Sequence, residues 1–348
     1  MTKNQDRHVW IDLARIIGSF LVVMIHVTSP ILTRYQQISQ QSWMSGNFYD
    51  SIARLSVPMF FMITGALLLG KTEPLPEYFR KRLTKVLIPL VAWSLVYFFW
   101  AYWADQSGLT LKRLAKLWYS PAYYHLWYLY ALLGLYLVIP ILRMITLHSD
   151  ARLLGLYIAL WFTASGIFPL LEKTLEISLL PDLQFASGFA GYLVAGYFLS
   201  KTPLSKRWAA FSALLMVCSA IGTIALTYIA SSQKGQFVGT YYEYLSPNIL
   251  LLSTSAFYFV RWASSNLPAL TGLSHKAIQT LASASLGIYL VHIIPMTLLE
   301  KGMLGISLTA WSFNPLFAIP ATTLAVYCAS LAITVILQRI PLINKIVP

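Results

Sequence analysis

Apolar residues fall into ten long runs along the chain, separated by short polar or basic stretches. The runs cover residues 10–29, 50–70, 86–104, 125–146, 152–171, 185–200, 208–230, 246–264, 278–299 and 316–338. A helix of about 20 apolar residues is long enough to cross the hydrocarbon core of a bilayer. The pattern therefore predicts an all-α polytopic membrane protein with about ten transmembrane helices. The weakest run is 185–200, which is short for a complete span.

Composition supports a lipid bilayer as the surroundings of this chain. Of its 348 residues, 57% are hydrophobic and only 11% are charged, whereas a soluble domain carries about a quarter charged residues. No internal repeat and no low-complexity linker divides the chain, so we expect a single transmembrane domain over residues 1–348.

Cys218 and Cys328 both lie inside apolar runs without metal-ligand spacing. We expect both to be small core residues and expect no metal site.

The formal net charge of +13 predicts an orientation in the membrane. Lys and Arg residues stand in short clusters between apolar runs, as the positive-inside rule describes, and not on one face or one tail. This distribution argues against nucleic acid as a partner. If the N-terminus is cytoplasmic, about two thirds of the 25 Lys and Arg residues fall in cytoplasmic segments. We therefore predict that both termini are cytoplasmic.

The first apolar run contains two ionisable residues, Arg15 and His26. Eleven helical steps of about 100° return to nearly the same face, with a rise of about 16 Å. Ionisable residues inside a span are costly and are usually kept for function. Asp12 precedes Arg15 by three residues and is placed to form an ion pair that would help the helix to insert.

Two further histidines occupy positions within the predicted spans. His125 opens the fourth run and His292 lies about two thirds along the ninth, so the orientation places both in the same outer half as His26. Histidine suits acid–base work near neutral pH. Each ring could instead make only an interhelical hydrogen bond, and that alternative stays open. For His26, the shared face with Arg15 favours a site.

A basic loop follows the second run and contains Arg80, Lys81 and Arg82. Two interpretations stay open for this loop. It could serve only to hold its end of the membrane domain in the cytoplasm. It could also capture a phosphorylated donor, because arginine forks match the oxygens of phosphate groups.

Four stretches give the chain a family resemblance. They are Trp10-Ile11-Asp12-Leu13-Ala14-Arg15 with His26, Pro58-Met59-Phe60-Phe61-Met62-Ile63-Thr64-Gly65, Phe79-Arg80-Lys81-Arg82 followed by Ile88-Pro89, and His125-Leu126-Trp127-Tyr128-Leu129 with Ser285-Leu286-Gly287-Ile288-Tyr289-Leu290-Val291-His292. The first fits an Arg-x10-His pattern, and the second is similar to Phe-Phe-x-Ile-Ser-Gly with Thr64 in place of serine. In their order and spread these motifs resemble the acyltransferase-3 family of integral membrane acyltransferases, in particular bacterial O-acetyltransferases of surface polysaccharides.

The resemblance implies an acyl donor on the cytoplasmic side and a hydroxyl of a surface glycan or lipid-linked glycan precursor as the acceptor. It implies acetyl-CoA as a co-substrate with no tightly bound cofactor. It also implies a location in the bacterial cytoplasmic (inner) membrane.

The resemblance also implies roles for individual residues. His26 would remove the proton of the acceptor hydroxyl, and Arg15 would meet a carbonyl or phosphate oxygen of the donor. The other expected site residues are Arg80, Lys81 and Arg82 on the CoA phosphates, His125, Trp127 and His292 at the acceptor or oxyanion, and Asp12 in support of Arg15.

A different class of protein also fits the buried charge. A transporter or flippase for a lipid-linked sugar or small amphiphile would place ionisable residues inside its spans too. The absence of a visible inverted repeat and the set of motifs favour a transferase. A third alternative is a non-catalytic membrane sensor, against which the intact Arg15 and His26 argue.

Overall fold

The computed structural model describes residues 6–105, 108, 110–117, 120–176, 187–268 and 271–348. Within these ranges every regular element is a helix, which confirms the all-α prediction. The long unbroken helices are α1 (Asp6–Leu32), α4 (Leu75–Asp105), α6 (Trp127–His148), α10 (Lys206–Lys234), α11 (Pro247–Ser265) and α15 (Pro315–Arg339). The short ones include α5 (Leu111–Lys116), α9 (Ala190–Lys201) and the one-turn η1 (Tyr124–Leu126), η4 (Thr240–Tyr242) and η5 (Ile343–Lys345).

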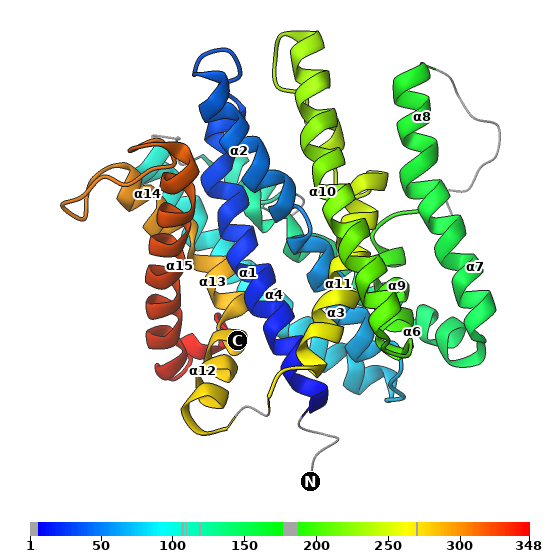
Figure 1. The fold of residues 1–348 in the computed structure, drawn as a ribbon. Helices are drawn as coiled ribbons and strands as arrows, with labels where there is room; N and C mark the ends of the chain where they lie inside the picture. The colour runs from blue at the N-terminus through cyan, green and yellow to red at the C-terminus, as the bar shows by residue number, and fades with distance from the viewer. Residues whose placement is uncertain (1–5, 106–107, 109, 118–119, 177–186, 269–270) are drawn as a thin grey trace.

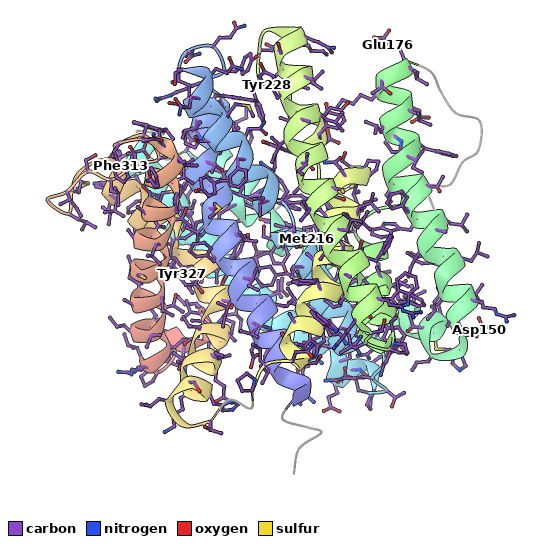
Figure 2. All side chains as sticks on the ribbon, viewed as in Figure 1. Asp150, Glu176, Met216, Tyr228, Phe313 and Tyr327 are labelled. Atoms are coloured by element: carbon purple, nitrogen blue, oxygen red, sulfur yellow. The ribbon has the colours of Figure 1, made fainter. Side chains whose placement is uncertain are left out.

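Three of the predicted runs form broken helices. The second run forms α2 (Gln40–Ala53) and α3 (Ser56–Leu68), and the ninth lies within α12 (Gly272–Ser283), α13 (Ser285–Val291) and α14 (Ile293–Glu300). The fifth forms α7 (Ala151–Phe162), the π turn η2 (Thr163–Ile167) and α8 (Phe168–Leu175), which continue one another from Asp150 at one end to Glu176 at the other (Figure 2). Hydropathy alone does not reveal such breaks, because both sides of each break are apolar.

In the described part of the chain, seven helical segments are long and apolar enough to cross a membrane. They are Val9–Leu32, Gln40–Leu68, Leu75–Ala104, Tyr124–His148, Ala151–Leu175, Lys206–Lys234 and Pro315–Arg339. Most described residues of the other three predicted runs are also helical, although residues 187–189 precede α9 and residues 185–186 lie outside the described ranges. Of these three, α9 has only 12 residues, and the ninth run is divided among short helices.

Helix α1 is the central element of the bundle (Figure 1). It packs against α2, α3 and α11 and also against α12, α13 and α15. The α7–α8 rod lies at one edge of the bundle, beyond α10 (Figure 1). Side chains on α1 are therefore enclosed by helices from both halves of the sequence, which places Arg15 and His26 in the interior.

The outer faces of the helices are apolar, as expected for surfaces that contact lipid. Cys218 on α10 and Cys328 on α15 are both exposed on such faces, so the prediction that they are core residues was wrong. Lipid tails are as apolar as a protein core, so apolar runs do not distinguish a lipid-facing position from a buried one.

The closest helix contact in the core joins α3 and α9 through two glycines. A methyl group at Gly65 would overlap the backbone of Leu193, and one at Gly196 would overlap the backbone of Met62. Small residues allow helix backbones to approach closely inside a membrane. The glycine that ends the Phe-Phe-Met-Ile-Thr-Gly stretch is therefore required by packing.

We expect Gly65→Ala to destabilise the protein by about 1–3 kcal/mol or more, the usual cost of overpacking a core. The reason is that the new methyl group would overlap the backbone of Leu193. The measurement is thermal stability of the detergent-solubilised protein, followed as the monomeric fraction after heating. Gly134→Ala in α6 is the matched control, because a methyl group there would meet no atom within 4 Å. Equal stability of the two variants would contradict this account of α3 and α9.

Candidate active site

Three histidines from distant parts of the sequence converge inside the bundle. The ring centroids of His26 and His292 are 4.9 Å apart, those of His125 and His292 are 5.2 Å apart, and those of His26 and His125 are 6.3 Å apart. They come from α1, from η1 and from the junction of α13 and α14. We call these three residues the histidine cluster. The sequence predicts that these three histidines lie in the same half of the membrane. It does not predict that their rings lie next to one another.

Only one member of the histidine cluster is accessible. His125 and His292 are 1% and 0% exposed, whereas His26 is partly exposed beside the ring of Tyr124 at 5.2 Å. A substrate that enters the cluster would therefore meet His26 first. The described residues contain no group of three or more His, Cys, Asp and Glu side chains placed to hold a metal ion.

The backbone sets the orientation of the His292 ring. Nδ1 of His292 lies 2.7 Å from the carbonyl oxygen of Tyr289, and a carbonyl only accepts, so Nδ1–H is the donor and Nε2 carries the lone pair. Nε2 of His292 and both ring nitrogens of His125 are buried without a hydrogen-bond partner in the structure. Buried polar atoms usually bind protein or ordered water, so these nitrogens are placed to bind water or another polar group.

A cavity of about 480 Å³ leads toward the histidine cluster from one end of the bundle. Four cationic side chains line it: Arg15, Lys71, Arg82 and Lys85. Tyr128 and Tyr289 also line it, with ring centroids 5.5 Å apart. The Tyr289 ring lies 5.6 Å from His125 and 6.2 Å from His292. The cavity therefore has a basic lining and shares the Tyr289 ring with the histidine cluster.

Arg15 lines the cavity with a side chain that is 36% exposed. Asp12 lies 3.6 Å away between Oδ1 and Nη1, and this intrahelical ion pair confirms the one expected from the spacing. The carboxylate thus partly compensates Arg15 and leaves its guanidinium facing the cavity.

The basic loop contributes to the cavity through only one of its three predicted residues. Arg82 lines the cavity, whereas Arg80 and Lys81 are exposed and are not among its lining residues. Lys71 and Lys85 line it in addition, and sequence reasoning missed both. For Lys85 the available signal was helical spacing, because residues 82 and 85 are three apart and share a face of α4.

Arg82 is held at the cavity by a network that includes Glu73. The Glu73 carboxylate lies 3.4 Å from Arg82 and accepts a hydrogen bond of 2.7 Å from Arg143. Nε of Arg143 also donates to the carbonyl of Leu68 at 2.9 Å. The hydrogen bond from Arg143, together with the charges of both arginines, lowers the pKa of Glu73.

Trp127 lies close to the histidine cluster in sequence but contacts a different aromatic group. Its ring stacks on Tyr244 at 5.6 Å with an interplanar angle of 26°, and Phe189 lies 5.8 Å away. The structure therefore places Trp127 beside the η4 region, next to the turn that carries His125.

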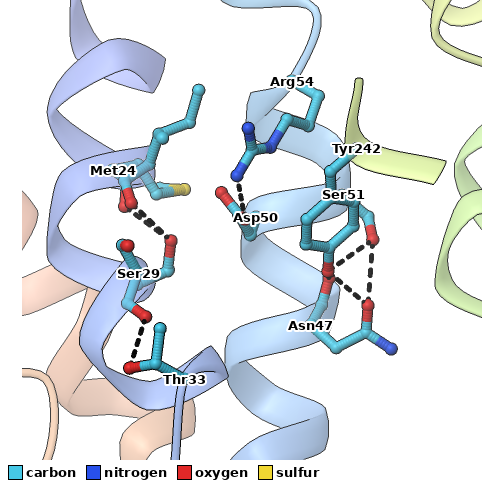
Figure 3. Close-up of polar contacts among 10 residues, drawn as sticks. Met24, Ser29, Thr33, Asn47, Asp50, Ser51, Arg54 and Tyr242 are labelled. Carbon is cyan, nitrogen blue, oxygen red and sulfur yellow. Dashed lines mark hydrogen bonds and ion pairs between the residues drawn. The ribbon is translucent and has the colours of Figure 1, made fainter. Parts of the chain in front are cut away.

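An ion pair between Asp50 and Arg54 is the feature that sequence reasoning missed most clearly. Nη2 of Arg54 donates to Oδ2 of Asp50 at 2.6 Å (Figure 3), and the carboxylate is fully buried. The sequence signal was a pair of opposite charges at i and i+4 in an apolar run. The predicted run begins at Asp50, which places this residue at a helix end, whereas the helical segment begins at Gln40 and encloses it.

The fold and the site together define a polytopic helical membrane protein with a basic cavity that leads to buried histidines. The chain belongs to the acyltransferase-3 family, because the family model described as "Acyltransferase domain" matches residues 8–339. The resemblance to the acyltransferase-3 family is thereby confirmed, and the protein is a membrane acyltransferase. No curated protein and no solved structure matches the chain.

We expect Glu73→Gln to destabilise the protein at pH 7 by about 1.5–3 kcal/mol, the worth of a hydrogen bond to a charged group. A lowered pKa means that the stabilisation is complete above the ordinary glutamate pKa of about 4.3 and is lost as pH falls through the folded value. The gap in melting temperature between wild type and variant should therefore close as the pH is lowered below about 4.

The control for this measurement is Glu77→Gln, which removes an exposed ion pair with Lys81 and should change stability by less than about 1 kcal/mol. A gap between wild type and Glu73→Gln that stays constant from neutral to acidic pH would contradict the assigned role of the carboxylate.

Proposed function

We propose that this acyltransferase moves an acetyl or other small acyl group from cytoplasmic acetyl-CoA to a hydroxyl of a surface glycan or lipid-linked glycan precursor. The observation that carries the proposal is a cavity lined both by four cations and by Tyr289, whose ring contacts His125 and His292 of the histidine cluster. In this proposal the protein lies in a bacterial inner membrane with ten spans and cytoplasmic termini.

The cations suit the phosphate groups of CoA. Arg82 supplies a fork that matches phosphate oxygens, and the lysines add flexible positive charge. Lys71 and Lys85 are exposed, so an anionic donor would meet them as it enters. Arg80 and Lys81 lie on the same basic segment, where they would attract the donor without lining the cavity.

The length of the donor fits the distance to the histidine cluster. The pantetheine arm of CoA extends roughly 15–20 Å by extended-chain reckoning. Arg15 and His26 are separated by a rise of about 16 Å along α1. A CoA whose phosphates lie among the cations would therefore carry its thioester to the level of His26, with Arg15 beside the donor on the way.

His26 is the proposed general base. It is the accessible member of the histidine cluster, and a base must come within hydrogen-bond reach of the proton that it removes. The buried His125 and His292 would hold its ring or the acceptor in place through their unpartnered nitrogens. Trp127, stacked on Tyr244, would form one wall for the acceptor.

We expect His26→Ala to reduce acetyl-CoA turnover by about 10²–10⁴-fold, the usual contribution of a general base. The measurement is thiol release by purified protein in detergent with an alkyl glycoside as the hydroxyl probe. His148→Ala is the matched control, because His148 is exposed and contacts only the carbonyl of Met144. Wild-type turnover in His26→Ala would overturn the proposal.

We expect Lys71→Gln combined with Lys85→Gln to weaken acetyl-CoA binding by up to roughly 30-fold, at about 1 kcal/mol or less for each cation. The wild-type affinity should fall with added salt, and the double variant should show a smaller salt dependence. Lys206→Gln is the control, as an exposed lysine outside the cavity.

Binding and turnover in detergent also separate the proposal from a transporter. A transferase consumes acetyl-CoA without a sealed membrane, whereas a transporter needs one. If wild type neither binds nor turns over acetyl-CoA, the transporter becomes the better interpretation.

A further inference from the structure

The proposed function leaves one buried ion pair without a role. Asp50 and Arg54 lie within the segment Gln40–Leu68, which is long and apolar enough to span a membrane. The Asp50 side chain is 0% exposed and that of Arg54 is 17% exposed. Ionisable residues at such positions are expensive and mark functional sites more often than structural ones. A buried ion pair is also weak evidence for stability, because desolvation offsets its attraction.

The Arg54 guanidinium is held from two sides. Asp50 accepts a hydrogen bond from Nη2 at 2.6 Å, and the guanidinium carbon lies 4.7 Å from the centre of the Tyr242 ring. The Tyr242 hydroxyl is itself fixed by hydrogen bonding to Asn47, and Ser51 donates to it at 3.4 Å. A guanidinium has five N–H donors, and Asp50 uses one of its nitrogens. Arg54 therefore has a fixed plane and N–H groups beyond the one that Asp50 binds.

The ion pair faces the part of α1 that carries His26. Figure 3 shows Asp50 and Arg54 directed toward α1 between Met24 and Ser29. The guanidinium carbon of Arg54 also lies 5.9 Å from the centre of the Tyr244 ring, which stacks on Trp127, two residues after His125. Arg15, by contrast, is separated from His26 by about 16 Å along the helix. At the level where a base would act, Arg54 is therefore the better placed of the two guanidinium groups.

The charge balance of the pair favours a transient anion over a permanent one. A carboxylate at 2.6 Å already compensates Arg54 in the resting protein. A ligand with a permanent negative charge would have to compete with Asp50. A negative charge that develops only during the reaction needs a donor that is already oriented, and preorganised donors of this kind stabilise transition states strongly.

We propose that Arg54 stabilises the oxyanion that forms on the acyl carbonyl when the acceptor attacks beside His26, with Asp50 as its positioning residue. This inference rests on the proposed function. The acceptor oxygen forms a bond to the carbonyl carbon while its proton passes to His26, and the carbonyl oxygen becomes an oxyanion that Arg54 binds. The oxyanion then collapses and the carbon–sulfur bond breaks. The thiolate of CoA leaves and takes the proton from His26.

A structural role makes a different prediction. Arg54 is the residue at which α2 ends, and its backbone N–H donates to the carbonyl of Asp50 at 3.0 Å. If the ion pair only braced the break between α2 and α3, removing one partner would leave an unpaired buried charge. Neutralising both partners together would then restore most of the lost function, because neither charge is left alone.

The experiment compares Arg54→Gln, Arg54→Lys and the double variant Asp50→Asn with Arg54→Gln. Purified proteins in detergent receive acetyl-CoA as donor and octyl β-D-glucoside as the hydroxyl probe, and thiol release gives kcat and KM. Equilibrium binding of acetyl-CoA provides a readout that does not depend on chemistry. Lys173→Gln is the matched control, because it breaks an exposed ion pair with Glu243.

We expect Arg54→Gln to lower kcat by about 10²–10³-fold, the usual effect of removing one oxyanion donor. The KM and the binding constant for acetyl-CoA should stay within about two-fold, since the donor phosphates bind elsewhere. The double variant should be as slow as Arg54→Gln. Arg54→Lys, which keeps the charge and loses the fork, should retain part of the activity and tests the role even if the glutamine variants fail to fold.

Three results would overturn the inference. Normal kcat in Arg54→Gln or Arg54→Lys would exclude a role in the reaction while leaving the proposed function intact. Recovery of activity in the double variant would assign the ion pair to structure. Wild type that releases no thiol, or that matches His26→Ala, would overturn the proposed function and this inference with it.

Discussion

The cost of charge inside an apolar bundle determines where each functional group of this protein lies. Three arginines illustrate this constraint: Arg54 meets Asp50, Arg15 meets Asp12 and the cavity, and Arg82 meets Glu73 and the cavity. In hydrocarbon an isolated charge would cost several kcal/mol or more. The same constraint explains why the four cavity-lining cations gather at one end, where Lys71 and Lys85 are exposed. In the proposed function, this distribution of charge would separate the donor phosphates from the reacting groups.

Sequence reasoning could predict most of the fold, because hydropathy reports directly which segments avoid water. All ten apolar runs coincide with helices in the described residues, yet only seven qualify as spans by length and composition. The breaks within them were not predictable, since a break such as that between α2 and α3 has apolar residues on both sides. Lipid-facing positions such as Cys218 and Cys328 were also not predictable, because lipid and core select the same residues.

The candidate site was predictable where one helix or one charge pattern carries the information. The face shared by Arg15 and His26, and the ion pair between Asp12 and Arg15, follow from helical periodicity alone. The contact between His26 and His292 depends on how α1 packs against α13, which a single sequence does not encode in any local pattern. The cavity could not be predicted either, because its lining also depends on how the helices pack: Lys71 and Lys85 reach it from two different segments.

The separation of the two ends has a consequence for how the site avoids wasteful hydrolysis. Lys71 and Lys85 are exposed to water, but Tyr289, which is 6% exposed, lines the cavity and contacts the buried His125 and His292. A donor that fills the cavity would displace water from the path along which its thioester reaches His26. Electrostatic interactions strengthen where water is excluded. In the proposed function the reacting groups would thus act in a drier environment than the phosphates, which would bind near the exposed lysines, where the desolvation cost of their charge is low.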